Sequence, residues 1–301
     1  MLLLDEPRWP AHGTMYGHLV SDESLWELHD GARRAGLDVR AFDHDHYDLR
    51  ADRVPAALAA GAVLVDSREL VRRMRAGGTR TGHADHAPRR GRSRDLLRRV
   101  VDAHLPGQGF VAHEVVKAYG APGRVYHDVR HLVEMLTHQQ SLAAAVDHRL
   151  SRAEVLATLV HDLVHGIGPG QDEELSAERG GALLGRAGLP SREVAEVQRL
   201  VLLTIDHRPD PGDVAGAVLS DADMAILGSA PGRYHVSVRD LRREYGRFDD
   251  QQWRSGRGQV LRAFLEQELF ATAPGRMWWQ ERAASNVADE LAHLHSPLEE
   301  L

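Results

Sequence analysis

The sequence contains no cysteine and only one lysine, Lys117, and it has no long apolar run. The absence of cysteine excludes disulfide scaffolds, thiolate metal sites and a cysteine nucleophile. Any metal must therefore be held by nitrogen and oxygen ligands, for which 19 histidines are present. No stretch approaches the roughly 20 apolar residues that span a bilayer, and the start lacks a basic and apolar leader. We therefore expect a cytoplasmic protein with no membrane partner.

Charge and size narrow the class of protein further. The net charge of −7 argues against general nucleic-acid binding, so we expect no nucleic-acid partner. The 301 residues are enough for about two domains, and the 43% of apolar residues allow a buried core. Nothing in the composition indicates the oligomeric state.

The first part of the chain, residues 1–76, has the pattern of a small α/β domain. Short apolar strands are expected at residues 2–4, 39–42 and 62–65, and a helix at residues 24–35. Strands that alternate with helices predict a small parallel sheet. Residues 77–92 carry glycines, a proline and an arginine cluster without apolar periodicity, so we expect a flexible linker there.

The rest of the chain, residues 93–301, is predicted to be almost entirely helical, which makes the fold mainly α with a small N-terminal α/β domain. A capping-box sequence, Ser151 to Glu154, marks the start of one helix. Apolar spacing and the positions of Pro and Gly predict helices at residues 95–104, 127–140, 151–165, 173–187, 191–205, 213–227, 234–245, 251–271 and 277–294.

Three groups of polar residues stand out in these helices. His161 and Asp162 lie in an otherwise apolar helix, where burial is costly unless a partner such as a divalent cation is present. The alternative is a pair that faces solvent. The second group is His127 and His131, which are four residues apart and therefore lie on one face of a helix. The third group is Asp221-Ala-Asp223. Separate helices can bring such ligands together in the core of a bundle.

This order of groups resembles the HD superfamily of metal-dependent phosphohydrolases, an HD-type helical bundle. The run from Tyr126 to His131 is similar to a motif of the cyclic-nucleotide phosphodiesterases, which share that helical core. The similarity extends to a bacterial branch of predicted HD-superfamily phosphohydrolases through five segments in the same order: residues 124–131, 161–162, 172–177, 221–228 and 242–245.

The resemblance implies a divalent metal ion (Mn, Mg, Co, Ni, Fe or Zn) held by four residues. His131, His161 and Asp162 would be ligands together with a late aspartate. Asp223 matches the family pattern better, which leaves Asp221 as a supporting or substitute ligand. His127 matches the residue that donates a proton to the leaving oxygen in the phosphodiesterases, a role for which an imidazole is suited.

Further residues have two interpretations each. His165 replaces a tyrosine of the branch and would bind a second metal or cap a helix end. His207 resembles an extra histidine of the family and would contact phosphate or a second metal. Glu173 and Glu174 would orient the attacking water or simply favour a helix N-terminus. Asp172 stands where the branch has asparagine. The arginines Arg130, Arg239 and Arg242 would clamp a phosphate or form ordinary surface ion pairs.

The expected function is hydrolysis of a phosphate ester, a small nucleotide or a sugar phosphate, by a phosphomonoesterase or phosphodiesterase. The alternatives are a metal-dependent binding or sensing module without turnover and an HD-fold oxygenase with two irons. Residues 1–76 resemble a small bacterial domain of unknown function. In this part we expect a polar pocket at the strand ends, formed by Asp5, His18, Asp22, His46 and Asp48. The alternative is that these polar side chains are scattered over the surface.

Overall fold

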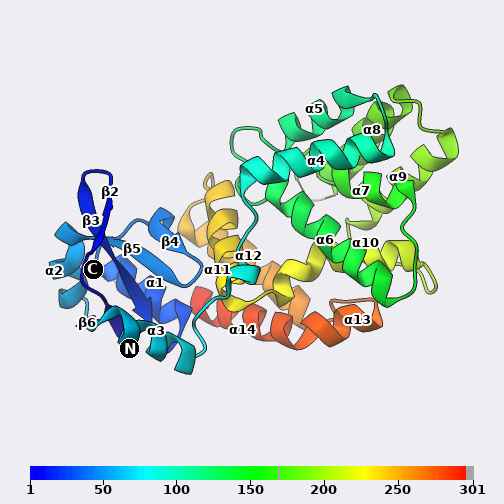
Figure 1. Ribbon diagram of the computed structural model, residues 1–301. Coiled ribbons are helices and arrows are strands. Elements are labelled where there is room, and N and C mark those ends of the chain that lie inside the picture. The colour runs from blue at the N-terminus through cyan, green and yellow to red at the C-terminus, as the bar shows by residue number, and fades with distance from the viewer. Residues whose placement is uncertain (169, 296–301) are drawn as a thin grey trace. The chain divides into compact units, whose positions relative to one another are not determined.

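The computed structural model describes residues 1–168 and 170–295, and it is mainly helical with a small N-terminal α/β region (Figure 1). That coarse fold class, as predicted from the sequence, is confirmed. The chain forms two compact units. Among the described residues, the N-terminal unit contains Met1–Ala87, Ser229–Arg242 and residues 292–295, and the helical unit contains Pro88–Gly228 and Arg243–Leu291.

The N-terminal unit is built on one sheet in the order β4-β5-β3-β1-β6, with β2 paired to β3. Its strands are β1 (Leu2–Leu4), β2 (Trp9–Ala11), β3 (Thr14–Ser21), β4 (Phe42–Asp43), β5 (His46–Arg50) and β6 (Val63–Leu64). Of these pairings only β1 with β6 is parallel, so the predicted parallel sheet is wrong. Residues 39–42, predicted as a strand, contain a 3-10 turn, Val39–Ala41.

A tight hairpin explains the antiparallel pairing of β2 with β3. β2 and β3 are joined by only two residues, His12 and Gly13, with φ angles of 47° and 76°. Positive φ at both central residues is the geometry of the two-residue turns that match the twist of antiparallel strands. The chain therefore returns directly to the sheet here, without the helical crossover that a parallel pair requires.

Alternation along β1 gives the sheet an apolar side chain on each face. Leu2 and Leu4 belong to one buried cluster and Leu3 to another. The helices of this part are α1 (Leu25–Arg34), α2 (Val54–Ala59) and α3 (Ser67–Ala76). The first cluster also contains Val236 of α11 (Pro231–Glu244), which explains why this late segment belongs to the N-terminal unit.

Hydrogen bonds fix part of the segment that was expected to be a flexible linker. Thr79 and Thr81 are buried, the Thr79 hydroxyl donates to the Ser21 carbonyl at 2.7 Å, and the Thr81 amide donates to Asp45 at 2.7 Å. These contacts place residues 79–81 in the N-terminal unit. A buried backbone needs such partners, because unpaired polar groups are costly.

The first helix of the helical unit, α4, begins at Arg90, two residues before the predicted end of the linker at residue 92. Its helices are α4 (Arg90–His104), α5 (Gly109–Ala118), α6 (Val129–Ala145), α7 (Arg152–Val160), α8 (Gln171–Arg186), α9 (Ser191–Leu203), α10 (Val214–Met224), α12 (Asp250–Leu265), α13 (Ala273–Gly275) and α14 (Glu281–His295). α14 passes into the N-terminal unit at Ala292. No helix in residues 1–168 or 170–295 is long and apolar enough to cross a membrane.

Two helix boundaries differ from the prediction in a way that matters for the site. The Asp128 side chain accepts a hydrogen bond from the Arg130 amide and caps α6, so His127 precedes the helix and does not lie on it. α7 ends at Val160, so His161 and Asp162 stand at its C-terminal end and His165 lies beyond it.

Candidate metal centre in the helical unit

Four predicted ligand residues lie together in the helical unit. His131 is in the first turn of α6, His161 and Asp162 follow the last turn of α7, and Asp223 is near the end of α10. His131 Nε2 is 3.1 Å from His161 Nε2 and 3.2 Å from Asp223 Oδ1. Asp162 Oδ2 is 3.4 Å from His161 Nε2. Ligand atoms of His131, His161 and Asp223 all lie within 4.8 Å of one another.

These separations fit a cation. Two ligands that are each about 2.1 Å from an ion and at a right angle to each other are about 3 Å apart. Imidazole and carboxylate ligands suit Zn, Fe, Mn, Co and Ni, and the donor set here is two nitrogens with two carboxylates. The residues present therefore fit a divalent metal ion.

Hydrogen bonds orient the imidazoles toward this point. His161 Nδ1 is 2.9 Å from the Thr158 carbonyl, so Nδ1 carries the proton and Nε2 is available as a ligand atom. His207 has φ of 55° and its Nδ1 is 3.2 Å from the Ser220 hydroxyl. Its Nε2 lies 3.8 Å from Asp223 Oδ2, so His207 borders the cluster.

The electrostatics of the cluster favour positive charge. Burial alone would lower the pKa of His161, but the neighbouring Asp162 and Asp223 raise it to about 9. Burial would raise the pKa of Asp223, yet His161 and His131 hold it well below its usual range. Two partly buried carboxylates thus favour a positive charge between them.

A second group adjoins the first through Asp162. Its members are His127, Asp162 and His165, whose ligand atoms lie within 4.8 Å of one another. His127 Nε2 is 4.0 Å from Asp162 Oδ2, and the His127 and His165 rings are 4.3 Å apart between centroids. The expected helix cap at His165 is not formed, because its Nε2 is 2.9 Å from Glu244 Oε1.

Glu244 organises this second group. Its Oε2 accepts hydrogen bonds from the amides of Val125, Tyr126 and His127 at 2.7, 2.9 and 3.1 Å. Its Oε1 contacts His127 Nδ1 as well as His165. Burial opposes the charged form, but these bonds hold the pKa of Glu244 far below its usual range. An anion fixed in this way orients His127 so that Nε2 faces Asp162.

The two candidate water-positioning carboxylates differ. Glu174 is exposed, whereas Glu173 is partly buried and its Oε2 has no hydrogen-bond partner within the described residues. Burial and the nearby charge of Asp162 raise the pKa of Glu173. Asp172 has a structural role, because its carboxylate accepts hydrogen bonds from the amides of Gly166 and Ile167 at 2.8 and 2.9 Å.

Three expected residues are engaged elsewhere. The Asp221 carboxylate is fully buried and accepts hydrogen bonds from the amides of Ala271 and Thr272, so it supports that segment and does not join the cluster. The Arg130 guanidinium binds Asp128 and the Val125 carbonyl, so it is not poised to clamp a phosphate. The Arg239 guanidinium donates to Asp240 and to the Phe42 carbonyl.

Sequence reasoning assigned no role to Glu244, to Tyr119 or to Arg124. The Tyr119 hydroxyl accepts a hydrogen bond from the Asp162 amide at 3.0 Å. Arg124 donates to the carbonyls of His127 and Leu163 at 3.2 and 3.1 Å, which ties the two ligand-bearing loops together. Glu244 and Arg124 lie in segments that resemble the family, and this position could have indicated a role for them in the site. No feature of the sequence indicated a role for Tyr119.

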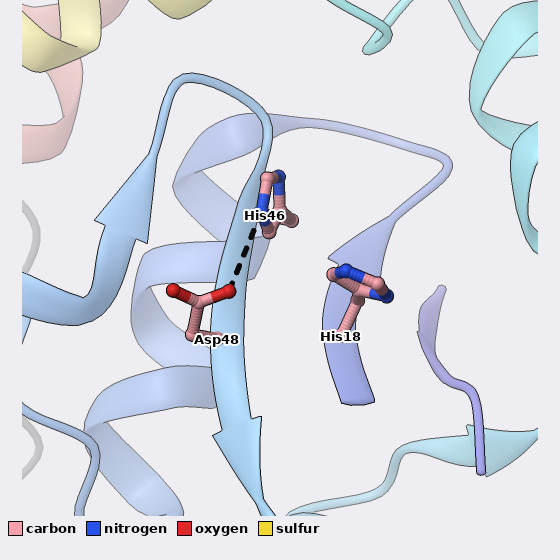
Figure 2. A group of neighbouring side chains, drawn as sticks. All are labelled: His18, His46 and Asp48. Carbon is pink, nitrogen blue, oxygen red and sulfur yellow. Dashed lines mark ion pairs between the residues drawn. The ribbon is translucent and has the colours of Figure 1, made fainter. Parts of the chain in front are cut away.

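The N-terminal unit has its own polar cluster. The side chains of His18, His46 and Asp48 gather on neighbouring strands β3 and β5 (Figure 2). Asp5 contacts His18 Nδ1 at 3.2 Å. Asp22, which was expected in the same pocket, instead pairs with Arg73 and with the N-terminal amine.

Comparison with known proteins informs only this first unit. No curated protein and no solved structure matches the chain. Residues 2–77 match the family described as a protein of unknown function, DUF4031. The expected resemblance of the first 76 residues to a small domain of unknown function is therefore confirmed, and the chain begins with a DUF4031 domain.

Proposed function

We propose that the helical unit is a metal-dependent phosphohydrolase of the HD superfamily that acts on a small phosphate ester, a nucleotide or a sugar phosphate. The observation that carries the proposal is the convergence of His131, His161 and Asp223, whose ligand atoms lie within 4.8 Å of one another, with Asp162 Oδ2 3.4 Å from His161 Nε2. The order of these residues in the sequence supports it, because it resembles that superfamily.

The bound metal would polarise a phosphoryl oxygen and lower the pKa of a water molecule. His127, held by Glu244, would donate the proton that the leaving oxygen needs. Glu173 has a buried oxygen without a partner and is close enough to feel the charge of Asp162, so it is suited to orient the attacking water. Glu244 is a positioning residue, because it acts through His127.

Basic side chains for the substrate differ from those first expected. An open pocket of about 540 Å³ lies beside His165 and Glu244. Arg124, Arg179 and Arg247 line it. Guanidinium groups recognise phosphate oxygens well, since they offer paired donors. Because Arg124 and Arg247 already donate to backbone carbonyls, as Arg130 does, Arg179 is the proposed phosphate-binding residue.

The test is a panel of nucleotides and sugar phosphates, assayed for released inorganic phosphate with Mn²⁺, Mg²⁺, Co²⁺ and Ni²⁺. The His161→Ala variant is expected to lose bound metal and activity together. His113→Ala is the matched control, because His113 is an exposed histidine on α5 of the same unit. A metal-loaded protein that releases phosphate from no substrate would contradict the proposal and favour a binding or sensing module.

The second group supports one alternative function. His127, Asp162 and His165 form a second set of ligand atoms, and Asp162 also contacts His161 of the first. Two metals that share Asp162 would suit a binuclear hydrolase or a di-iron oxygenase. Elemental analysis separates these once metal bound by the N-terminal unit is subtracted: one metal in the helical unit supports His127 as the proton donor, and two irons there with oxygen consumption support the oxygenase.

A further inference from the structure

His18, His46 and Asp48 lie on one face of the N-terminal sheet because of its register. β3 and β5 are antiparallel, and His18 stands directly opposite Asp48. His46 precedes Asp48 by two residues, so both side chains point to the same face. Figure 2 shows the two histidines and the carboxylate converging there.

The distances within this group are those of a ligand set. Its ligand atoms all lie within 4.8 Å of one another. The imidazole rings are 5.0 Å apart between centroids, and His46 Nε2 is 3.7 Å from Asp48 Oδ1. The side chains of His18, His46 and Asp48 are 30%, 20% and 56% exposed, so the group is open to solvent.

A second observation points to a cation and not to chance proximity. Both histidines are held at Nδ1 by buried carboxylates, His18 by Asp5 at 3.2 Å and His46 by Asp45 at 2.9 Å. Asp5 and Asp45 are only 2% and 1% exposed. A carboxylate behind the far nitrogen is the usual support of a metal-binding histidine, because it fixes the ring and leaves Nε2 for the metal.

These supporting carboxylates are themselves anchored. Asp5 accepts hydrogen bonds from the His18 amide and the Ser67 hydroxyl, both at 2.7 Å. Asp45 accepts from the Thr81 amide at 2.7 Å and from Arg80 at 2.6 Å. Gly17 lets the strands approach here, since an added Cβ would lie 2.9 Å from Asp5 Oδ1.

We propose that His18, His46 and Asp48 bind a divalent transition-metal ion on the open face of the N-terminal sheet. Two histidines and one carboxylate leave coordination positions unfilled, which is typical of metal sites that bind a further ligand. His18 and Asp48 also line an open pocket of about 660 Å³, which gives such a ligand room. This second metal site is independent of the one proposed in the helical unit.

The experiment is a titration of the full-length, metal-free protein with Co²⁺, followed by visible absorption and by elemental analysis after dialysis. Asp48→Asn is expected to remove one equivalent of bound metal, or to weaken that site at least about tenfold, since loss of a mere supporting partner typically costs about 10- to 100-fold. Asp223→Asn should remove a different equivalent, and the double variant should remove both.

Control variants keep the result interpretable. His12→Asn is the matched control, because His12 lines the same pocket outside the ligand group and asparagine tolerates its positive φ. His46→Gln should repeat the loss seen with Asp48→Asn. Zn²⁺ should raise the thermal midpoint of Asp223→Asn, which keeps the N-terminal site, more than that of the double variant, which keeps neither site.

The proposal would be overturned if Asp48→Asn and His46→Gln bound as many equivalents of metal as His12→Asn, with unchanged affinity. That outcome would leave the site in the helical unit untouched. Conversely, loss of metal in Asp223→Asn alone would support only the helical site.

Discussion

Asp221 and Asp223 are two residues apart, and the structure gives them different partners. Asp223 Oδ1 faces His131, whereas the Asp221 carboxylate binds Ala271 and Thr272. We predict that Asp223→Ala lowers metal affinity and that Asp221→Ala lowers the free energy of unfolding, by about 2 to 4 kcal/mol, because buried donors lose a charged acceptor. Metal titration and urea unfolding of both variants measure the two effects.

A different outcome for Asp221→Ala would contradict this prediction. If Asp221→Ala lost metal while its urea midpoint stayed that of the wild type, Asp221 would be a ligand. Asp223→Asn serves as the control for charge, since it keeps the shape of the side chain.

His127 gives the second prediction at this scale. Replacement of His127 by Ala should lower turnover about 10²- to 10⁴-fold for a nucleoside phosphate, whose leaving group needs a proton. The loss should be much smaller for p-nitrophenyl phosphate, whose leaving group needs little protonation. Rates for both substrates on one metal-loaded variant test this, and metal content should be unchanged.

Glu244→Gln is the companion variant. It keeps the size of the side chain but removes the charge that holds His127 Nδ1. The same dependence on leaving group, at a smaller amplitude, would identify Glu244 as the residue that positions His127. Equal losses for the two substrates in both variants would contradict the role of His127 as proton donor.

At the residue scale, the sequence indicated the ligand cluster because polar residues interrupt apolar helices at His131, His161 and Asp223. It could not indicate which carboxylates act as supports. Asp5, Asp45 and Glu244 are buried against backbone amides or imidazoles that are distant in sequence, and only the fold creates those contacts.

At the scale of elements, α1 and α11 meet in the N-terminal unit through two histidines, the partly buried His29 and the buried His235. His29 Nε2 is 3.0 Å from His235 Nδ1, and His29 Nδ1 is 2.7 Å from the Tyr47 hydroxyl. Burial lowers the pKa of His29 to about 3 and holds the pKa of His235 well below its usual range. Both imidazoles are therefore neutral in the folded state.

This contact predicts acid sensitivity. The unfolded chain takes up protons on both histidines below pH 6.5 and the folded chain does not, so stability falls as the pH decreases from about 6.5 toward 3. Between pH 7.0 and 5.5 the pair should contribute a loss of about 2.5 kcal/mol. Urea unfolding at the two pH values should show that loss reduced in a His29→Gln, His235→Gln variant. An identical pH dependence in that variant would contradict the prediction.

The elements also show where sequence patterns fail. Helix positions followed from apolar spacing, because α8 and α9 each present one apolar face to their neighbours. β3 was missed because Gly17 and His18 interrupt its apolar alternation, although the Gly13 turn before it is a hairpin signal. Helix ends shifted at His127 and His161, where capping and loop contacts outweigh periodicity.

At the scale of the whole molecule, the N-terminal unit is not one continuous stretch of sequence. Its larger apolar cluster includes Val236 in addition to residues from the first 62. We predict that a fragment of residues 1–87 unfolds at lower urea concentration than the same unit in the full chain. Within the full chain, Val236→Ala should lower the free energy of unfolding by about 2 kcal/mol, because two buried methyl groups are lost.

Hydrogen exchange compares the stability of the N-terminal unit in the 1–87 fragment with its stability in the full chain. Amides of β1 and α1 should exchange faster in the fragment than in the full chain. Equal protection would mean that residues 1–87 complete their core without Val236. Val214→Ala is a suitable control, since Val214 is exposed on α10 of the helical unit.

The separation of Val236 from residues 1–87 has a consequence for how the protein is made. A ribosome that adds about 5 to 20 residues per second needs roughly 7 to 30 s to extend the chain from residue 87 to residue 236. During that interval the first strands and α1 have left the ribosome while the valine that covers them has not been synthesised. The N-terminal unit is thus completed long after its first strands are synthesised, and its incomplete apolar surface is prone to aggregation in the meantime.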